Sequence, residues 1–278
     1  MNFHKLDKAI RYMYKISIRS FYTYIFMFLI PILLELFIYF YLFKKNIISD
    51  RVIVTGPLIF LVIVVNSLFV TNIVSTWRET IFIKQIKNFG INNLTFLVSL
   101  FIVYLTYSLV SLIVISCILL GIDTTSYDKK VINLFKTMFS QPSVLIIFIG
   151  IILNIILIFC ISILIAGFFR NVYLINSLFA LTLLYIIITG DYLIDYSFTQ
   201  SFVYQVFSYL NPQKYINWIF YISYTNSFNG SAELYKILDN VDNYFSFKNI
   251  YGPLFSSLFI IPIGAVLTYM SFNISVKK

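Results

Sequence analysis

Six long apolar runs dominate the sequence, and each approaches or exceeds the ~20 residues with which an α-helix crosses a bilayer. They cover residues 21–43, 52–75, 94–121, 143–169, 172–190 and 250–274. Lipid offers no partner to backbone N–H and C=O groups, so runs of this length predict helices. The sequence therefore predicts an all-α integral membrane protein with six transmembrane helices, and the length of the third and fourth runs predicts tilt.

Charged residues are too few for a separate soluble domain. They make up 11% of the 278 residues, against 60% that are hydrophobic, whereas a soluble domain is usually about a quarter charged. We therefore expect a single membrane domain over residues 1–278. Its parts are an N-terminal helix at 1–20, spans one to five at 21–190, an outer region at 191–249, and span six with a tail at 250–278.

The first twenty residues alternate apolar and basic side chains at helical spacing. The apolar residues are Phe3, Leu6, Ile10, Met13 and Tyr14, and the basic residues are Lys5, Lys8, Arg11, Lys15 and Arg19. This pattern predicts an amphipathic helix that lies on the anionic cytoplasmic leaflet, in contact with membrane lipid. The alternative is a disordered basic tail.

Six spans place both termini on one side of the membrane. That side has eleven Lys and Arg residues and the other has nine, but one opposing loop is about sixty residues long, and long loops carry little topological weight. We expect a multi-pass protein of the cell membrane with both termini in the cytoplasm, although Lys44, Lys45 and Arg51 in the first outer loop oppose this orientation. Cytoplasmic retention of cations explains the net charge of +9, so no nucleic-acid partner is expected.

Residues 77–90, between spans two and three, are too polar to span a membrane and too apolar for a simple loop. Wound as a helix, the segment has an apolar face of Phe82, Ile83, Ile86 and Phe89, a basic face of Lys84 and Lys87, and a stop at Gly90. An amphipathic helix of this kind is suited to docking into a groove on a partner protein.

Arg78-Glu79 after the second span, followed by Lys84-Gln85-Ile86, resembles the coupling segment of permease subunits in the type 2 exporter family of ABC transporters. Gly190 at the end of the fifth run and Asn211-Pro212 in the outer region fit that family too. The order of elements matches over nearly the whole chain. Two departures are the very short turn near Arg170 and the length of the outer region.

This resemblance implies a permease that works as a dimer, with a second identical or related permease copy and with cytoplasmic ABC ATPase subunits. ATP and Mg would be bound by the ATPase, and this chain would bind no cofactor. The implied ATPase-coupling interface comprises Arg78, Glu79, Phe82, Lys84, Ile86, Lys87 and Phe89.

The residue inventory also argues against catalysis by this chain. None of its nine glycines is followed by Lys, so the phosphate-binding loop of an ATPase is missing. A single histidine, His4, and two cysteines within apolar runs, Cys117 and Cys160, favour no metal site. Gly190-Asp191 superficially resembles an intramembrane aspartyl protease, but the second aspartate within another span is missing, and no filter-like channel motif occurs.

Glu35 is the only acid or base deep within a predicted span. Such a group must be protonated, paired or in contact with water. One interpretation places it on a substrate path with Asn66 and Asn176. The other is a protonated carboxyl bonded to a neighbouring amide, for example Asn66, Asn154 or Asn176. A proton-coupled carrier that uses Glu35 is the competing class of protein.

The outer region is rich in aromatic residues on either side of Asn211-Pro212, in pieces too short to span. A proline ends a helix, so we expect two re-entrant or interfacial helices before span six, with Asn211 and Pro212 in an outer gate. The alternative is an aromatic belt that rests at the lipid headgroups.

Spans rich in Phe, Tyr, Ile and Leu suit an amphipathic or hydrophobic cargo. Within the family, the composition is similar to that of Gram-positive peptide or bacteriocin exporters, including those that expel phenol-soluble modulins, so the resemblance implies peptide export. Export of a lipid-linked polymer or a drug by the same machinery is the alternative.

Overall fold

The computed structural model describes residues 3–43, 56–79, 90–126, 129–169, 171–191, 201–226, 228, 247 and 249–277. Within these ranges the regular structure is entirely helical. Six helical segments are long and apolar enough to cross a membrane: Phe21–Phe40, Ile59–Trp77, Asn93–Asp123, Val144–Phe168, Val172–Thr189 and Tyr251–Ile274. The predicted all-α class and its six apolar spans are confirmed.

The first span is assembled from α2 (Phe21–Tyr24), η1 (Ile25–Leu29), α3 (Ile30–Phe37) and η2 (Ile38–Phe43), where η marks π-helical turns. The second consists of η4 (Pro57–Leu61) and α4 (Val62–Glu79). The other spans are α6 (Asn93–Asp123), α8 (Val144–Phe168), α9 (Val172–Thr189) and α14 (Tyr251–Lys277). Only two residues, Arg170 and Asn171, separate Phe169 from the start of α9, which confirms the short turn predicted there.

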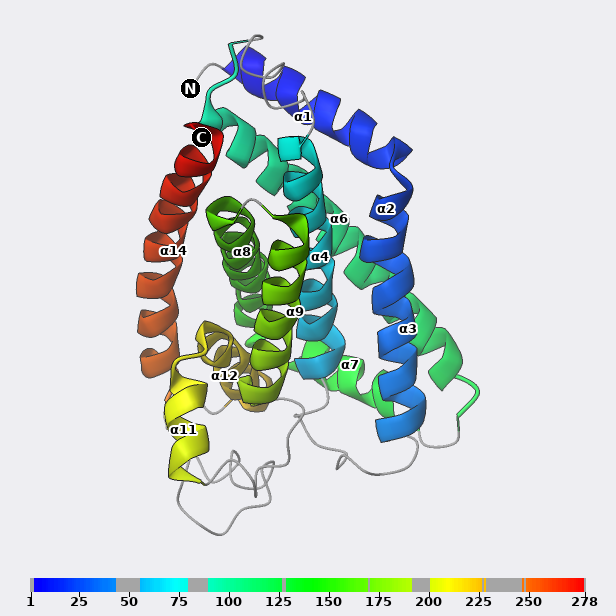
Figure 1. Ribbon diagram of the computed structural model, residues 1–278. Helices are drawn as coiled ribbons and strands as arrows, with labels where there is room; N and C mark the ends of the chain where they lie inside the picture. Colours follow the sequence, from blue (N-terminus) through cyan, green and yellow to red (C-terminus); the bar gives the residue numbers. More distant parts are fainter. Residues whose placement is uncertain are drawn as a thin grey trace.

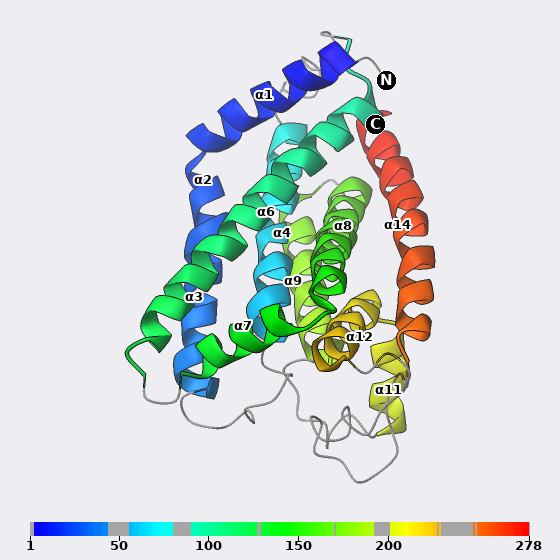
Figure 2. The same ribbon diagram turned by 180° about the vertical axis from the view of Figure 1, so that it is seen from behind.

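α4 is the central span, since most of its side chains are buried and it packs against α3, α6, α8 and α9. α8 lies beside α4 and packs against α14 on its other side. At 1.5 Å per residue, the 31 residues of α6 extend about 46 Å, which exceeds a hydrocarbon thickness of about 30 Å. α6 runs obliquely across the bundle (Figure 2), as its length predicted.

Both termini lie at the same end of the bundle (Figure 1), as an even number of spans requires. There, α1 (Phe3–Arg19) lies along the first part of α6 and buries a stripe of Ala9, Met13 and Ser17, spaced four residues apart. The amphipathic helix predicted for the first twenty residues is therefore formed, and the alternative of a disordered tail is wrong for Phe3–Arg19. Its basic residues Lys8, Arg11, Lys15 and Arg19 are exposed.

Among the described residues, three short helices lie at the opposite end (Figure 1): α7 (Lys130–Ser140), α11 (Phe202–Tyr209) and α12 (Pro212–Thr225). α7 was not predicted. Its buried side chains Val131, Leu134 and Met138 recur at helical spacing, so the sequence held a signal for it. Eleven residues are too few to span, and α7 lies between the ends of α6 and α8 (Figure 2).

Candidate functional site

The described helices α11 and α12, which precede span six, are separated at the predicted Asn211-Pro212 break. Asn211 is the N-cap of α12, where its Oδ1 accepts a hydrogen bond from the Gln213 N–H at 3.0 Å, and Pro212 takes the first helical position. The Asn211 Nδ2 donates to Thr189 Oγ1 at 2.9 Å. Asn211 therefore starts α12 and also holds it against the end of α9.

α12 and α11 differ sharply in burial. Twelve of the fourteen residues of α12 are buried, whereas α11 buries only Ser208. α12 packs against α8 and α14, and its Phe220 ring meets Phe60 of η4 edge-on, with centroids 5.4 Å apart. α12 thus enters the bundle, so an aromatic belt resting at the headgroups does not describe it.

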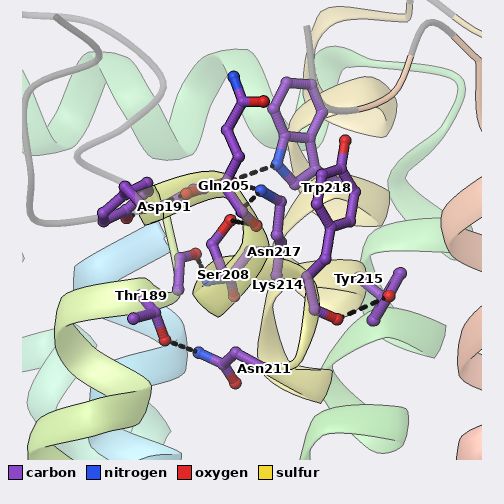
Figure 3. A network of polar contacts seen from close by, with 12 residues as sticks. Thr189, Asp191, Gln205, Ser208, Asn211, Lys214, Tyr215, Asn217 and Trp218 are labelled. Carbon is purple, nitrogen blue, oxygen red and sulfur yellow. Dashed lines mark hydrogen bonds and ion pairs between the residues drawn. The ribbon is translucent and has the colours of Figure 1, made fainter. Parts of the chain in front are cut away.

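A buried ion pair joins α12 to the end of span five. Lys214 Nζ lies 3.1 Å from Asp191 Oδ2, and the two side chains are only 1% and 10% exposed. Lys214 Nζ also donates to Ser208 Oγ at 2.5 Å and lies 4.2 Å from the centroid of the Tyr209 ring. Burial lowers the pKa of Lys214, and the neighbouring Asp191 carboxylate opposes that shift. Figure 3 shows the network around this pair.

Asp191 is the centre of the network. Its Oδ2 also accepts from Trp218 Nε1 at 3.0 Å, its Oδ1 accepts from Tyr204 Oη at 3.1 Å, and its carbonyl accepts from Tyr221 Oη at 2.7 Å. Its φ of +57° turns the chain out of span five. Burial and the Asp191 charge raise the pKa of Tyr204. Both carboxylate oxygens accept hydrogen bonds from side chains of α11 or α12, so the cluster holds these helices against the end of span five.

Asp191 and Lys214 both lie in the region predicted to be outer, and nothing in the sequence pairs them. Their separation of 23 positions gives no periodic signal, because α11 and other residues lie between them. The only hint was that Asp191 directly follows the fifth apolar run and that Lys214 lies in a segment rich in aromatic residues. Ser208, Asn217 and Trp218, which complete the network, carried no separate signal.

Glu35 lies on the buried stripe of span one, with Thr23, Met27 and Pro31 at four-residue spacing. Its side chain is 1% exposed, and neither carboxyl oxygen has a hydrogen-bond partner among the described residues. Asn66 and Asn154 are also fully buried and lack side-chain partners there. The expected bond from Glu35 to one of these amides is therefore not made.

Asn176, which was expected on a substrate path with Asn66, is not buried beside it. It is exposed on α9, because the buried positions of that helix are Ile175, Phe179, Ile186 and Thr189, and the next residue after Ile175 is rotated outward by about 100°. The structure does not bring Asn176 together with the buried Asn66 within this chain.

Most of the predicted coupling segment, Thr80 to Phe89 with Phe82, Lys84, Ile86 and Lys87, lies outside the described residues. Arg78 and Glu79 end α4, but their side chains also lie outside the described part. Gly90, the predicted stop, has a φ of +69°, a conformation that suits glycine after a helix. Lys5 Nζ of α1 donates to the Gly90 carbonyl at 3.1 Å.

Among the described residues, no group of three or more His, Cys, Asp and Glu side chains is placed to hold a metal. The arrangement as a whole is that of a multi-pass membrane protein with a buried polar network at one end. We call this network, which is centred on Asp191 and Lys214, the polar lock. The chain matches no protein-family model, no curated protein and no solved structure at a significant level.

Proposed function

We propose that this chain is the membrane-spanning permease subunit of an ATP-driven exporter, similar to those of the type 2 ABC exporter family. It would move an amphipathic or hydrophobic substrate, a peptide in the narrower form of the proposal, out of the cytoplasm or the inner leaflet. The observation that carries the proposal is the placement of the accessory helices on the six-span bundle. α1 lies at the end with both termini, and the broken pair α11–α12 lies at the other (Figure 1).

The orientation of this bundle follows from the charges on α1. Its exposed cations at the terminal end suit an anionic cytoplasmic leaflet, which supports cytoplasmic termini in the cell membrane. The α11–α12 pair would then lie on the outer side, where the polar lock around Asp191 and Lys214 would hold the outer gate closed.

Coupling to an ATPase would act through the segment that joins α4 to α6. α4 packs against four other spans or parts of spans, so a displacement of its cytoplasmic end would reach most of the bundle. The hydrogen bond from Lys5 to Gly90 connects the same segment to α1. ATP-driven closure of two ATPase subunits, which bind the ATP and Mg, would move this segment in each permease of a dimer and switch the path from inward to outward opening.

Replacing Ile86 by Asp tests this interface. Burying one isoleucine side chain is worth about 1.5–3 kcal/mol, so the aspartate should weaken ATPase binding by at least about tenfold. We expect transport by Ile86→Asp to fall accordingly in membrane vesicles, with the chain still inserted. Ile18→Asp, at an exposed position of α1 on the same side, is the control and should transport normally. Full transport by Ile86→Asp would refute the interface.

The cargo is tested by deleting the chain and challenging cells with amphipathic peptides, drugs and cell-wall precursors. If the chain exports peptides, cells that lack it should be more sensitive to peptides and should secrete less peptide than wild-type cells. If both are unchanged while a lipid-linked precursor accumulates inside, the cargo is a lipid-linked polymer, and increased sensitivity to drugs alone assigns drug export.

A proton-coupled carrier is the second candidate, and one observation favours it: Glu35 is buried without a hydrogen-bond partner among the described residues. Glu35→Gln separates the two classes, because the amide keeps the shape and cannot exchange a proton. For an ATP-driven permease we expect Glu35→Gln to change the transport rate by less than about tenfold, which corresponds to 1.4 kcal/mol. Complete loss of transport, with normal insertion, would favour the carrier.

A further inference from the structure

α12 presents two different polar faces. The first face is turned to Asp191 and belongs to the polar lock, to which it contributes Lys214 and Trp218 (Figure 3). The second lies about 100° around the helix. It is a stripe of side chains at helical spacing, which we call the amide stripe: Gln213, Asn217 and Phe220.

The amide stripe is turned toward the outer ends of spans two and five. The Phe220 ring meets the Phe60 ring of η4 edge-on, with centroids 5.4 Å apart, and η4 begins span two. Asn217 Nδ2 donates to the Gly190 carbonyl at 2.5 Å, and Gly190 directly follows α9. All three side chains of the stripe are fully buried. The amide stripe is therefore the inner surface of the proposed outer gate.

A one-way chain of hydrogen bonds fixes the orientation of both amides. The Gly190 carbonyl can only accept, so the Asn217 amide turns its Nδ2 toward that carbonyl and its Oδ1 away from it. Asn217 Oδ1 then accepts from Gln213 Nε2 at 3.0 Å. The chain ends on Gln213 Oε1, which is buried and has no donor among the described residues.

A buried acceptor without a donor is costly and rare in proteins, so Gln213 Oε1 points to a ligand that donates a hydrogen bond. A neutral donor suits it better than a cation, because the amide stripe offers no carboxylate to a buried charge, and Asp191 is paired with Lys214 on the other face. A helical peptide carries neutral donors of this kind, since its first four backbone N–H groups have no partner within the helix.

We propose that Gln213 Oε1 is a cargo-binding site on the inner surface of the outer gate, and that it accepts a hydrogen bond from a backbone N–H in the first turn of a helical peptide. This inference rests on the proposed export of peptides. Because Gln213 is fully buried, the peptide reaches it only when α12 moves away from its neighbours. Cargo binding therefore favours the open gate over the closed one.

Peptide binding to the purified chain in lipid nanodiscs, without nucleotide, tests the site. The probe is an amphipathic helical peptide of Leu, Lys and Ser, and each of its analogues has an ester oxygen in place of one first-turn N–H. We expect one analogue to bind wild type about fivefold more weakly than the parent peptide, the usual effect of one hydrogen bond. Gln213→Met keeps the length of the side chain and removes the acceptor, so the fivefold difference should disappear.

Asn217→Leu is the matched control, because it breaks the same amide chain but leaves Gln213 Oε1 in place. It should retain the fivefold difference. Each comparison is a ratio measured on one protein, so a smaller folded fraction affects both peptides alike. The site would be overturned by a difference that persists in Gln213→Met, by one that disappears in both variants, by equal binding of all peptides to wild type, or by no peptide binding. No nucleotide takes part, so transport that ignores ATP would contradict the proposed function and leave this result unchanged.

Discussion

Asp191→Asn is expected to destabilise the protein by about 3–5 kcal/mol, the usual cost of leaving one partner of a buried ion pair unpaired. Asparagine keeps the size of the side chain and tolerates the positive φ of this position, so the change isolates the loss of charge. Lys214 would remain with Ser208 Oγ and the Tyr209 ring, neither of which is anionic. Thermal unfolding of the purified protein in detergent measures the loss.

The pH dependence of this variant follows from the direction of the Lys214 shift. Burial already lowers the pKa of Lys214 from 10.5, and loss of the carboxylate lowers it further. The unfolded chain then binds a proton that the folded chain releases, so stability rises with pH between the folded and unfolded pKa values. We expect Asp191→Asn to be most harmful at low pH and to recover part of its stability as the pH approaches 10.5.

Two further variants serve as controls for the ion pair. Adding Lys214→Met to Asp191→Asn removes the uncompensated cation and should recover part of the lost stability, since an apolar side chain suits this site. Asp7→Asn breaks the exposed pair of Asp7 with Arg11, whose side chains are 54% and 80% exposed and 3.0 Å apart. An exposed pair contributes about 0–1 kcal/mol. If Asp191→Asn lowered the stability no more than Asp7→Asn does, the buried pair would not be what holds α12 against the end of span five.

Gly167→Leu is expected to disrupt the packing of α8 on α14. A Cβ atom at Gly167 would lie 2.6 Å from Ser271 Oγ and 3.0 Å from the Ser271 carbonyl carbon. The second of these is backbone, so α14 itself would have to move. Small residues at helix crossings allow such close approach in membranes, and overpacking costs about 1–3 kcal/mol or more. We expect a lower unfolding temperature and less monodisperse protein after extraction.

Gly121→Leu is the matched control, because a Cβ atom at this exposed glycine of α6 would meet nothing within 4 Å. It should fold as well as the wild type. Equal stability of Gly167→Leu and Gly121→Leu would contradict the close crossing of α8 and α14.

The spans could be predicted from sequence because bilayer thickness fixes how long an apolar helix must be. The break before Pro212 could also be predicted from local sequence, since proline ends a helix by its own geometry. Burial of α12 was not predictable in this way, because its contacts with α8, α14 and η4 join segments that lie far apart in the sequence. The Asp191–Lys214 pair depends on the same tertiary packing.

Asn176 shows that the presence of a polar residue within a span does not reveal whether its side chain faces the interior or the exposed surface. α9 has apolar side chains on every side, so its sequence gives no amphipathic pattern from which the buried face could be found. A rotation of one position from Ile175 decides between the interior and the exposed surface. In span one, by contrast, the four-residue spacing from Met27 through Pro31 to Glu35 is a single buried stripe.

We propose that ATP, hydrolysed by a partner, drives transport through this chain. The most direct measurement is substrate movement in sealed inverted vesicles prepared from membranes that contain the chain and its native partners, with the proton gradient collapsed by an uncoupler. We expect transport to require Mg-ATP on the cytoplasmic side, and we expect the purified chain alone to hydrolyse no ATP. Transport that proceeds without nucleotide when a proton gradient is imposed, and stops when that gradient is removed, would contradict it.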